Sequence, residues 1–259
     1  MTINKLNSSN YIEKRQMIIT ARLAAQGTML EELKALVSII QPETARIDVR
    51  RAIMEDNIFH RPSISSRIKV FDKLSGRYFR SDMPKAVESF VCALKNEPDQ
   101  TQIALLAYTM LLWNDALVFT LGEQWLARRL SGPRIPAETS EIEAELDHLS
   151  KKAPEIKKWT LNTRRTVSTK YLGLLRDCGF ATGTLRKVLR RPYISPDVVL
   201  FSIKLIIGGG DSLVNLPGHP LFRSMGLYID DVIEKLTELQ AQDRIDFAVQ
   251  GGIVHFAPR

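Results

Sequence analysis

The stretch KKWTLNTRRTVSTKYLGLLRDCGF, residues 157–180, has the pattern of an amphipathic helix whose polar side is almost entirely positive. Its apolar residues recur at helical spacing and predict one buried face: Val167, Tyr171, Leu174 and Leu175. Another face is expected to carry Arg164, Arg165 and Ser168. We expect this helix to run from about Asn162 to Asp177, with Gly179 as the residue that ends it.

Positive charge is concentrated around this helix. Residues 151–191 contain twelve Lys or Arg and two acidic residues, a net charge of +10, whereas the whole chain carries +7. The start of the helix could bind a phosphate, because its free backbone N–H groups and three short polar side chains can donate hydrogen bonds to it. These side chains belong to Thr160, Asn162 and Thr163. The pattern predicts a polyanionic partner. Two plainer interpretations stay open: a solvated basic face, or a face that pairs with the acidic run 138–147.

The residues after this helix favour a winged-helix arrangement. FATGTLRKVLRRPYIS, residues 180–195, predicts two short extended pieces around a Gly-Thr turn. A helix followed by such a hairpin is typical of modules that place the helix in the DNA major groove and the hairpin, or wing, on adjacent backbone. Four basic residues would lie on or beside this wing: Arg186, Lys187, Arg190 and Arg191.

Helical periodicity dominates the residues before this segment. Thr28 and Glu31 predict a capping box at one helix start, and Pro42 suits the first turn of the next helix. After Pro62, a helix is expected with apolar and basic residues on opposite sides: Ile68, Phe71 and Leu74 against Arg67, Lys69, Lys73 and Arg77. Further helices are expected over 9–25, 83–96 and 99–130, the last of them broken near Asn114 or Gly122.

SGPRIPAETS, residues 131–140, is the clearest linker, because it holds two prolines and a glycine. It predicts a helical N-terminal domain over 1–135 and a winged-helix-like C-terminal domain over 136–259. The acidic run behind it is expected to be a solvated helix. The apolar segment 197–207 predicts a helix or a buried strand, of which we favour the helix. Residues 225–242 predict a further helix, and residues 244–258 predict a terminal hairpin with a Gly-Gly turn. The expected fold class is mainly α, with a few short β-strands.

No pattern in the sequence indicates catalysis or a cofactor. The four histidines, at 60, 148, 219 and 255, lack metal-ligand spacing, and GGGDS (208–212) lacks the lysine of a P-loop. Cys92 and Cys178 form no CxxC pair and are predicted to be buried, reduced thiols. The chain shows no apolar signal-peptide core and no uncharged apolar run of the ~20 residues that a membrane span needs. We therefore expect a cytoplasmic, non-enzymatic protein that binds neither metal nor membrane.

Three stretches resemble the BrxA family, the small component of BREX bacteriophage-defence systems. They are MLEELKALVSII (29–40), EDNIFHRPSISSRIKVFDKLSGRYF (55–79) and the segment 157–180, and they follow one another in the family's order and spacing. The resemblance covers about 28–195. It implies a compact, mostly helical, non-enzymatic DNA-binding protein that acts beside the system's methyltransferase, ATPase and other subunits. The tail after about residue 210 is longer than the family pattern leads us to expect.

The resemblance also suggests where double-stranded DNA would be contacted. Carried onto this sequence, the contacts lie on the basic helix and the wing: Lys157, Lys158, Arg164, Arg165, Lys170, Arg186, Lys187, Arg190 and Arg191. A second basic patch is expected earlier in the chain: Arg61, Arg67, Lys69 and Lys73. Two other functions stay open. One is an adaptor that docks its basic surface on an acidic partner subunit, and the other is RNA binding, because the family fold has been likened to NusB.

Overall fold

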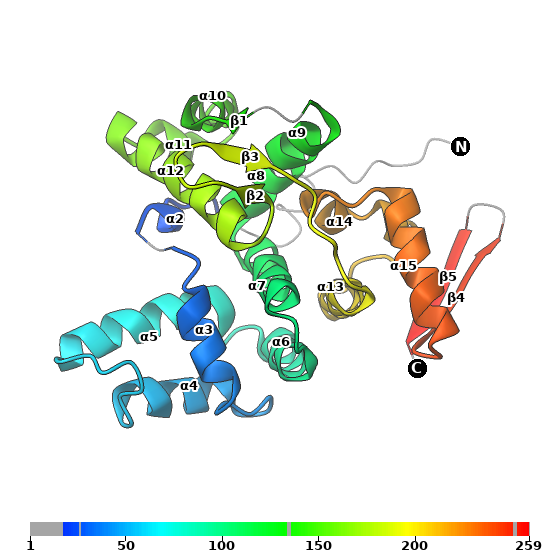
Figure 1. Ribbon diagram of the computed structural model, residues 1–259, viewed down its shortest axis with the longest axis horizontal. Coiled ribbons are helices and arrows are strands. Elements are labelled where there is room, and N and C mark those ends of the chain that lie inside the picture. The colour runs from blue at the N-terminus through cyan, green and yellow to red at the C-terminus, as the bar shows by residue number, and fades with distance from the viewer. Residues whose placement is uncertain (1–17, 26, 134–135, 251–252, 259) are drawn as a thin grey trace.

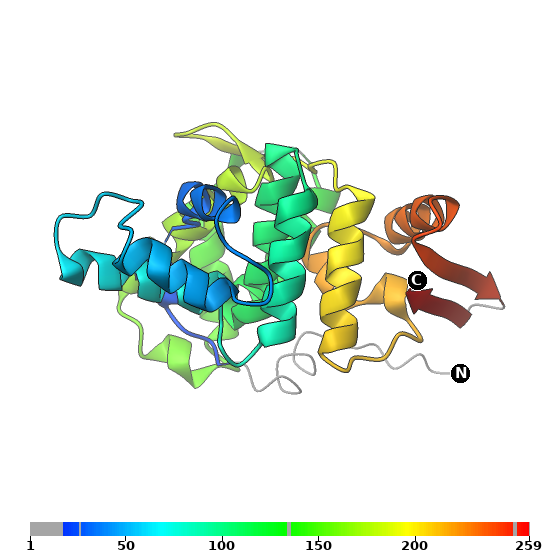
Figure 2. The same cartoon turned by 90° about the horizontal axis from the view of Figure 1, so that it is seen from below.

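One apolar helix, α7 (Gln100–Asn114), lies at the centre of the fold. The computed structural model describes residues 18–25, 27–133, 136–250 and 253–258, and Figures 1 and 2 show α7 between the other helices. Every residue from Gln102 to Asn114 is buried, because a helix that is apolar on all sides has to be covered on all sides. The elements before and after it are α2 (Arg22–Ala25), α3 (Leu30–Val37), α4 (Ala45–Met54), α5 (Ile64–Tyr78), α6 (Pro84–Asn96), α8 (Ala116–Leu121), the π-helical turn η1 (Gly122–Leu126) and α9 (Ala127–Ser131).

The predicted break in the long apolar segment is confirmed at Asp115. Its carboxylate accepts hydrogen bonds from the N–H groups of Leu117 (3.0 Å) and Val118 (3.2 Å), and these start α8. The helix axes before and after the break differ by 108°. The second predicted position, Gly122, begins the π-helical turn. Only glycine fits there without a shift, since a Cβ would lie 3.0 Å from the Ser224 carbonyl oxygen.

The same aspartate gives a pH-dependent prediction. Burial raises the pKa of Asp115 above its ordinary value, against the lowering effect of its two backbone hydrogen bonds. The folded chain therefore holds this proton to higher pH than the unfolded chain, and stability falls as pH rises through the raised pKa. Asn caps helices as well as Asp does, without the charge. We expect Asp115→Asn to be more stable than the parent at neutral pH, with an advantage that shrinks on acidification. Urea unfolding across acidic to neutral pH measures this, and a pH-independent difference would contradict it.

The predicted capping box at Thr28 is wrong. Met29, in the left-handed region with φ 52°, precedes α3 without a side-chain cap. The Thr28 hydroxyl instead donates a hydrogen bond to Asp177 Oδ2, 3.0 Å away at the end of another helix. A long-range partner thus replaces the local one. Pro42 also lies before α4 rather than in its first turn, and most of the helix predicted over 9–25 lies outside the described residues.

The second half of the chain adds seven helical elements and five strands among the described residues. They are α10 (Thr139–Leu149), α11 (Pro154–Lys157), α12 (Leu161–Asp177), α13 (Pro196–Gly208), the 3-10 turn η2 (Leu216–Gly218), α14 (Pro220–Ser224), α15 (Ile229–Ala241), β1 (Pro136–Ala137), β2 (Ala181–Thr182), β3 (Lys187–Leu189), β4 (Ile245–Gln250) and β5 (Ile253–Pro258). The prediction of a mainly helical chain with a few short strands is confirmed.

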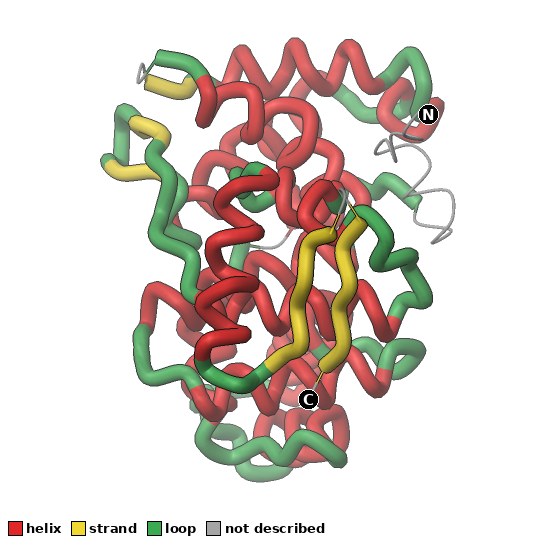
Figure 3. The backbone as a smooth tube through the Cα atoms, turned by 90° about the vertical axis from the view of Figure 1, so that its right-hand side faces the viewer, coloured by secondary structure: helices red, strands yellow, loops and turns green. Residues whose placement is uncertain are grey.

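Two small antiparallel sheets complete the fold. The first has the strand order β1-β3-β2, and its β2–β3 hairpin confirms the predicted pair of extended pieces. The predicted linker is wrong in part, because Pro136 and Ala137 pair with Val188 and Lys187 as β1 and α10 begins directly behind them. The second sheet is the predicted terminal hairpin, β4–β5, which lies alongside α15 in Figure 3. Its Gly-Gly turn lies outside the described residues.

One hydrophobic cluster runs through the fold. It includes buried residues from Leu23 to Phe247 and therefore joins elements from both sides of residue 135. For example, Phe90 of α6 and Phe201 of α13 have ring centroids 5.7 Å apart. The division into domains 1–135 and 136–259 stays a prediction.

Candidate nucleic-acid interface

Local signals define α12, the helix at the centre of the candidate interface. The Thr160 side chain accepts a hydrogen bond from the Thr163 N–H at 3.1 Å and caps the helix. Gly179, with φ 84°, ends it, as predicted. The predicted apolar face is buried, and Tyr171 packs edge-on against Trp125 of η1 with ring centroids 6.0 Å apart.

The two cysteines differ in their exposure. Burial raises the pKa of the Cys178 thiol at the end of α12, so this thiol stays protonated. The other cysteine, Cys92, is exposed, and the prediction that it is buried is wrong.

The solvent side of α12 is polar and basic. We call it the α12 outer face and define it by residues that recur three, four or seven positions apart: Asn162, Arg165, Thr166, Thr169, Lys170, Gly173 and Arg176. The side chains of Arg165 and Lys170 are exposed and form no ion pair with a described residue. Two threonine hydroxyls, of Thr166 and Thr169, donate to carbonyl oxygens one helical turn back. The one acid beside this face, Asp177, pairs with Arg176 at 2.7 Å.

Arg164 does not belong to the α12 outer face. Its guanidinium forms an ion pair with Asp147 of α10 and donates a hydrogen bond to the Ile156 carbonyl at 3.1 Å. Its side chain is only 16% exposed. Ser168 is fully buried, and its hydroxyl donates to the Arg164 carbonyl. The expectation that Arg164, Arg165 and Ser168 share one polar face is therefore wrong. For Arg164 the alternative interpretation is confirmed, because this residue pairs with an acidic residue of the run 138–147.

The acidic run is not a solvated helix. In α10, Ile142, Leu146 and Leu149 are buried. Its carboxylates pair with arginines of α9, with Glu141 2.9 Å from Arg129 and Glu145 2.9 Å from Arg128. These pairs, together with Asp147 and Arg164, fix α10 between α9 and α12.

Replacing Arg164 should therefore destabilise the fold. We expect Arg164→Ala to lower the free energy of unfolding by about 1–3 kcal/mol, because a charged hydrogen-bonding partner of a carbonyl and a carboxylate is lost. Arg165→Ala is the matched control, since an exposed side chain without described contacts changes stability by less than about 0.5 kcal/mol. Urea unfolding measures both variants. Equal stabilities of the two would contradict the assignment of Arg164 to the α10–α12 contact.

The wing presents fewer free cations than the sequence predicts. Arg186 and Lys187 lie at its tip, where Lys187 Nζ donates to the Thr184 carbonyl at 3.1 Å. Arg190 Nε donates to the Gly179 carbonyl at 3.0 Å, which ties the wing to the end of α12. Arg191 turns away and lies over the Tyr228 ring of α15, 4.4 Å from its centroid. The tip itself is tight, because a Cβ on Gly183 would lie 2.1 Å from the Arg186 carbonyl oxygen.

The second basic patch is divided in the same way. Lys69 is exposed and Lys73 is half-buried on α5. Arg67 instead donates to the Met54 carbonyl (3.0 Å) and the Arg61 carbonyl (3.4 Å), and so satisfies the end of α4. Arg77, expected on the basic side of this helix, is 5% exposed. Lys157 and Lys158, by contrast, are both exposed just before α12.

The residues that sequence reasoning missed are on the α12 outer face. Thr166, Thr169 and Arg176 carry no signal alone, but they lie four, seven and fourteen positions after Asn162, which places them on one side of a helix. Gly173 lies among them, and a Cβ there would meet no atom within 4 Å. The missed strand β1 has two residues and no periodic pattern that could have revealed it.

The described ranges contain neither a cluster of metal-binding side chains nor a single membrane-spanning helix. No group of three His, Cys, Asp or Glu side chains in 18–25, 27–133, 136–250 and 253–258 could hold a metal ion. In the same part of the chain no single helix is long and apolar enough to cross a membrane, although the bent pair of α7 and α8–α9 passes by length and composition.

The chain is thus a mainly helical protein that presents a polar, basic helix beside a small antiparallel sheet. Its sequence matches the BrxA family model over residues 18–203, and the chain belongs to this family. Membership indicates a BREX-associated protein, and BrxA is not a known family of enzymes. The match ends within α13, so α14, α15 and the terminal hairpin lie beyond it. No curated protein matches the chain.

Proposed function

We propose that this chain is a non-enzymatic accessory protein of a BREX phage-defence system that binds double-stranded DNA. In this proposal α12 enters the major groove and the β2–β3 wing contacts adjacent backbone. The observation that carries it is the α12 outer face, on which exposed Arg165 and Lys170 flank short polar side chains and no carboxylate precedes Asp177. A surface of this kind suits a polyanion better than it suits a neutral protein surface.

The topology supports the winged-helix interpretation. α10 and α12 lie between β1 and β2 in the chain, and β3 returns between these two strands in the sheet. α12 has 17 residues. At a rise of 1.5 Å per residue such a helix is about 25 Å long, ample for a recognition helix. The major groove is roughly 12 Å wide and admits one helix.

The proposal assigns roles to particular residues. Arg165 and Lys170, at the two edges of the α12 outer face, would contact phosphates, together with Lys157, Lys158, Arg186 and Lys187. Asn162 and Thr169 would face the base edges. Gly173 leaves open space in which the DNA backbone can approach the helix closely. Arg164 is left out of the contact set, because Asp147 and Ile156 hold its guanidinium.

Salt-dependent binding tests this proposal directly. Fluorescence anisotropy with a duplex of about 30 base pairs should show affinity that falls roughly 10³–10⁵-fold between 50 and 200 mM salt, if six to ten phosphates are neutralised. A structured RNA hairpin should compete poorly, because A-form RNA has a deep, narrow major groove that side chains cannot read.

Two outcomes would redirect the proposal. Preference for the RNA hairpin would favour NusB-like RNA binding. No binding to either nucleic acid at low salt, with capture of a BREX subunit that survives nuclease treatment, would favour an adaptor that docks on an acidic partner.

A further inference from the structure

The tip of the β2–β3 wing carries an apolar side chain that the described part of the fold does not cover. Four residues, Gly183 to Arg186, connect β2 to β3. Among the large apolar side chains of the described residues, that of Leu185 is the most exposed, at 97%. The next is Leu161 (85%), the first residue of α12. Single exposed apolar residues are common on protein surfaces, but these two lie on the two elements that the proposed function brings to DNA.

The base of the wing is fixed to the rest of the fold. Ala181 and Leu189, paired across the two strands, are both buried. On its other edge β3 pairs with β1. Arg190 Nε donates to the Gly179 carbonyl at 3.0 Å and so joins the end of β3 to the end of α12. The position of Leu185 is therefore set relative to α12.

The connection between the strands is short and tightly folded. Gly183 has φ 88°, and a Cβ on it would lie 2.1 Å from the Arg186 carbonyl oxygen. Lys187 Nζ donates to the Thr184 carbonyl at 3.1 Å, which ties the start of β3 to this turn. These contacts involve the residues on either side of Leu185 and leave its side chain outside them. A narrow tip with one projecting apolar side chain results.

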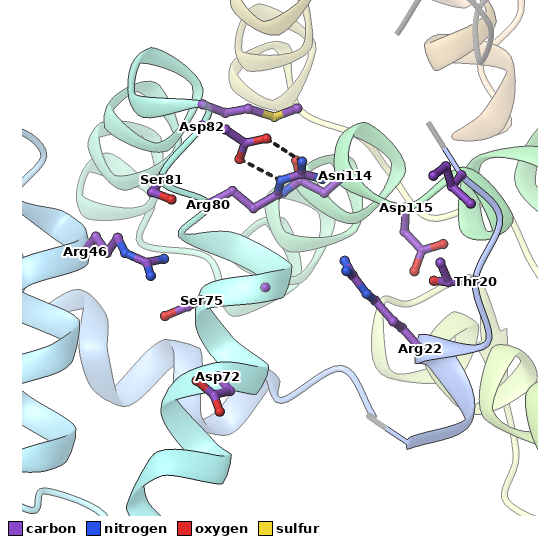
Figure 4. A pocket seen from close by; sticks show the side chains of 13 residues that line it. Thr20, Arg22, Arg46, Asp72, Ser75, Arg80, Ser81, Asp82, Asn114 and Asp115 are labelled. Atoms are coloured by element: carbon purple, nitrogen blue, oxygen red, sulfur yellow. Dashed lines mark hydrogen bonds and ion pairs between the residues drawn. The ribbon is translucent and has the colours of Figure 1, made fainter. Parts of the chain in front are cut away.

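The wing carries positive charge that its own sequence does not offset. Residues 178–196 contain no aspartate or glutamate and four basic residues: Arg186, Lys187, Arg190 and Arg191. The polar cleft beside the α7–α8 break is the opposite case (Figure 4). Three arginines and three aspartates line that cleft together, and Arg80 pairs with Asp82 at 2.5 Å. An anionic partner therefore fits the wing tip better than it fits the cleft.

An exposed apolar side chain flanked by cations suits the DNA minor groove. Proteins that bend DNA from this groove insert an apolar side chain between two base pairs, while basic residues contact the surrounding backbone. Leu185 followed by Arg186 and Lys187 has this combination. The minor groove is roughly 6 Å wide, so it excludes a helix and admits side chains from a narrow tip. It also lies next to the major groove, in which the proposed function places α12.

We propose that Leu185 is a wedge that enters the minor groove, partly separates two stacked base pairs and bends the duplex. This role of Leu185 rests on the proposed function, because the wing reaches DNA together with α12. It adds a class of preferred substrate. Duplexes whose base pairs separate easily, such as those with a flexible pyrimidine–purine step or a mismatch, are expected to bind more tightly than uniformly stacked ones.

Fluorescence anisotropy with two duplexes that differ only in a central T·T mismatch tests the wedge. The parent chain should bind the mismatched duplex about tenfold more tightly, because less pairing and stacking is lost there. Leu185→Ala should lose this preference, and Leu185→Met, which keeps an apolar side chain of similar volume, should retain it. Energy transfer between dyes on the two duplex ends should rise when the parent binds and stay unchanged when Leu185→Ala binds. Val214→Ala is the matched control, because Val214 is 68% exposed on the connection between α13 and η2.

Two further readouts separate a wedge from an ordinary backbone contact. Leu185→Ala should leave the melting temperature and the salt slope of duplex binding unchanged, because an exposed leucine neither supports the core nor neutralises a phosphate. Leu185→Lys should steepen the salt slope by about 1 and still lose the mismatch preference and the bend. A mismatch preference retained by Leu185→Ala or by Leu185→Lys would overturn the wedge.

Failure of the wedge can be told apart from failure of the proposed function. Salt-dependent duplex binding with the same bend in the parent and in Leu185→Ala would overturn the wedge alone. No duplex binding by the parent at low salt would overturn both. Sedimentation with vesicles of equal parts phosphatidylglycerol and phosphatidylcholine, lost in Leu185→Ala while duplex bending stays unchanged, would assign the tip to an anionic membrane surface instead.

Discussion

A chain carrying Arg165→Glu and Lys170→Glu together is expected to lose about 100-fold or more in duplex-DNA affinity while it keeps its fold. Both side chains are exposed on the α12 outer face and lack described ion pairs, so neither holds the structure together. A hydrogen bond to a charged group contributes roughly 1.5–3 kcal/mol. Losing two of them corresponds to a factor of about 100 or greater, and the new carboxylates add repulsion from the phosphates.

Anisotropy titrations at several salt concentrations measure this loss together with its origin. If both residues contact phosphates, the slope of log affinity against log salt should become shallower by about 2. Lys85→Glu with Lys204→Glu is the matched control, because it changes the net charge equally on exposed positions of α6 and α13. Equal losses in both double variants would show that net charge, and not the α12 outer face, governs binding. Unchanged affinity in the α12 variant would remove this helix from the interface.

Elements with local signals could be predicted from the sequence to within a residue or two. The two ends of α12 are set by Thr160, whose side chain accepts a hydrogen bond from the Thr163 N–H, and by Gly179, whose positive φ ends the helix. Both interactions involve only residues that are close in the sequence. The break at Asp115 is of the same kind, since a short carboxylate there can cap the next helix. Such features require no knowledge of the tertiary structure.

Features set by distant partners could not be predicted in this way. Thr28 forms a capping pattern, yet its hydroxyl bonds to Asp177, 149 positions away. Arg164 and Arg165 are adjacent in a basic run, but contacts with α10 and α11 bury the first and leave the second exposed. The charge of a segment was therefore predictable, while the division of its arginines between structure and surface was not. The same holds for Arg67, which satisfies the end of α4.

The largest expected loss of stability comes from a residue that joins the two halves of the chain. Phe90 is fully buried in α6. Its ring is stacked on Tyr78 of α5 at 5.7 Å and also lies 5.7 Å from Phe201 of α13. Phe90→Ala should lower the free energy of unfolding by about 3–5 kcal/mol, because it removes buried apolar area and leaves a cavity among close-packed rings. Tyr193→Ala is the matched control, since that ring is 64% exposed and its contact with Lys235 contributes roughly 0.5–1 kcal/mol.

Urea unfolding followed by tryptophan fluorescence and by far-UV circular dichroism reports this loss and tests the predicted domains as well. Since Phe90 contacts residues on both sides of residue 135, a single transition shifted equally in both signals would show that 1–135 and 136–259 unfold together. Two transitions, of which Phe90→Ala shifts only the first, would support separate domains. A loss no larger than that of Tyr193→Ala would contradict the role of Phe90 in the core. Because Phe90 is distant in sequence from the α12 outer face and fully buried, folded Phe90→Ala protein should bind duplex DNA as tightly as the parent.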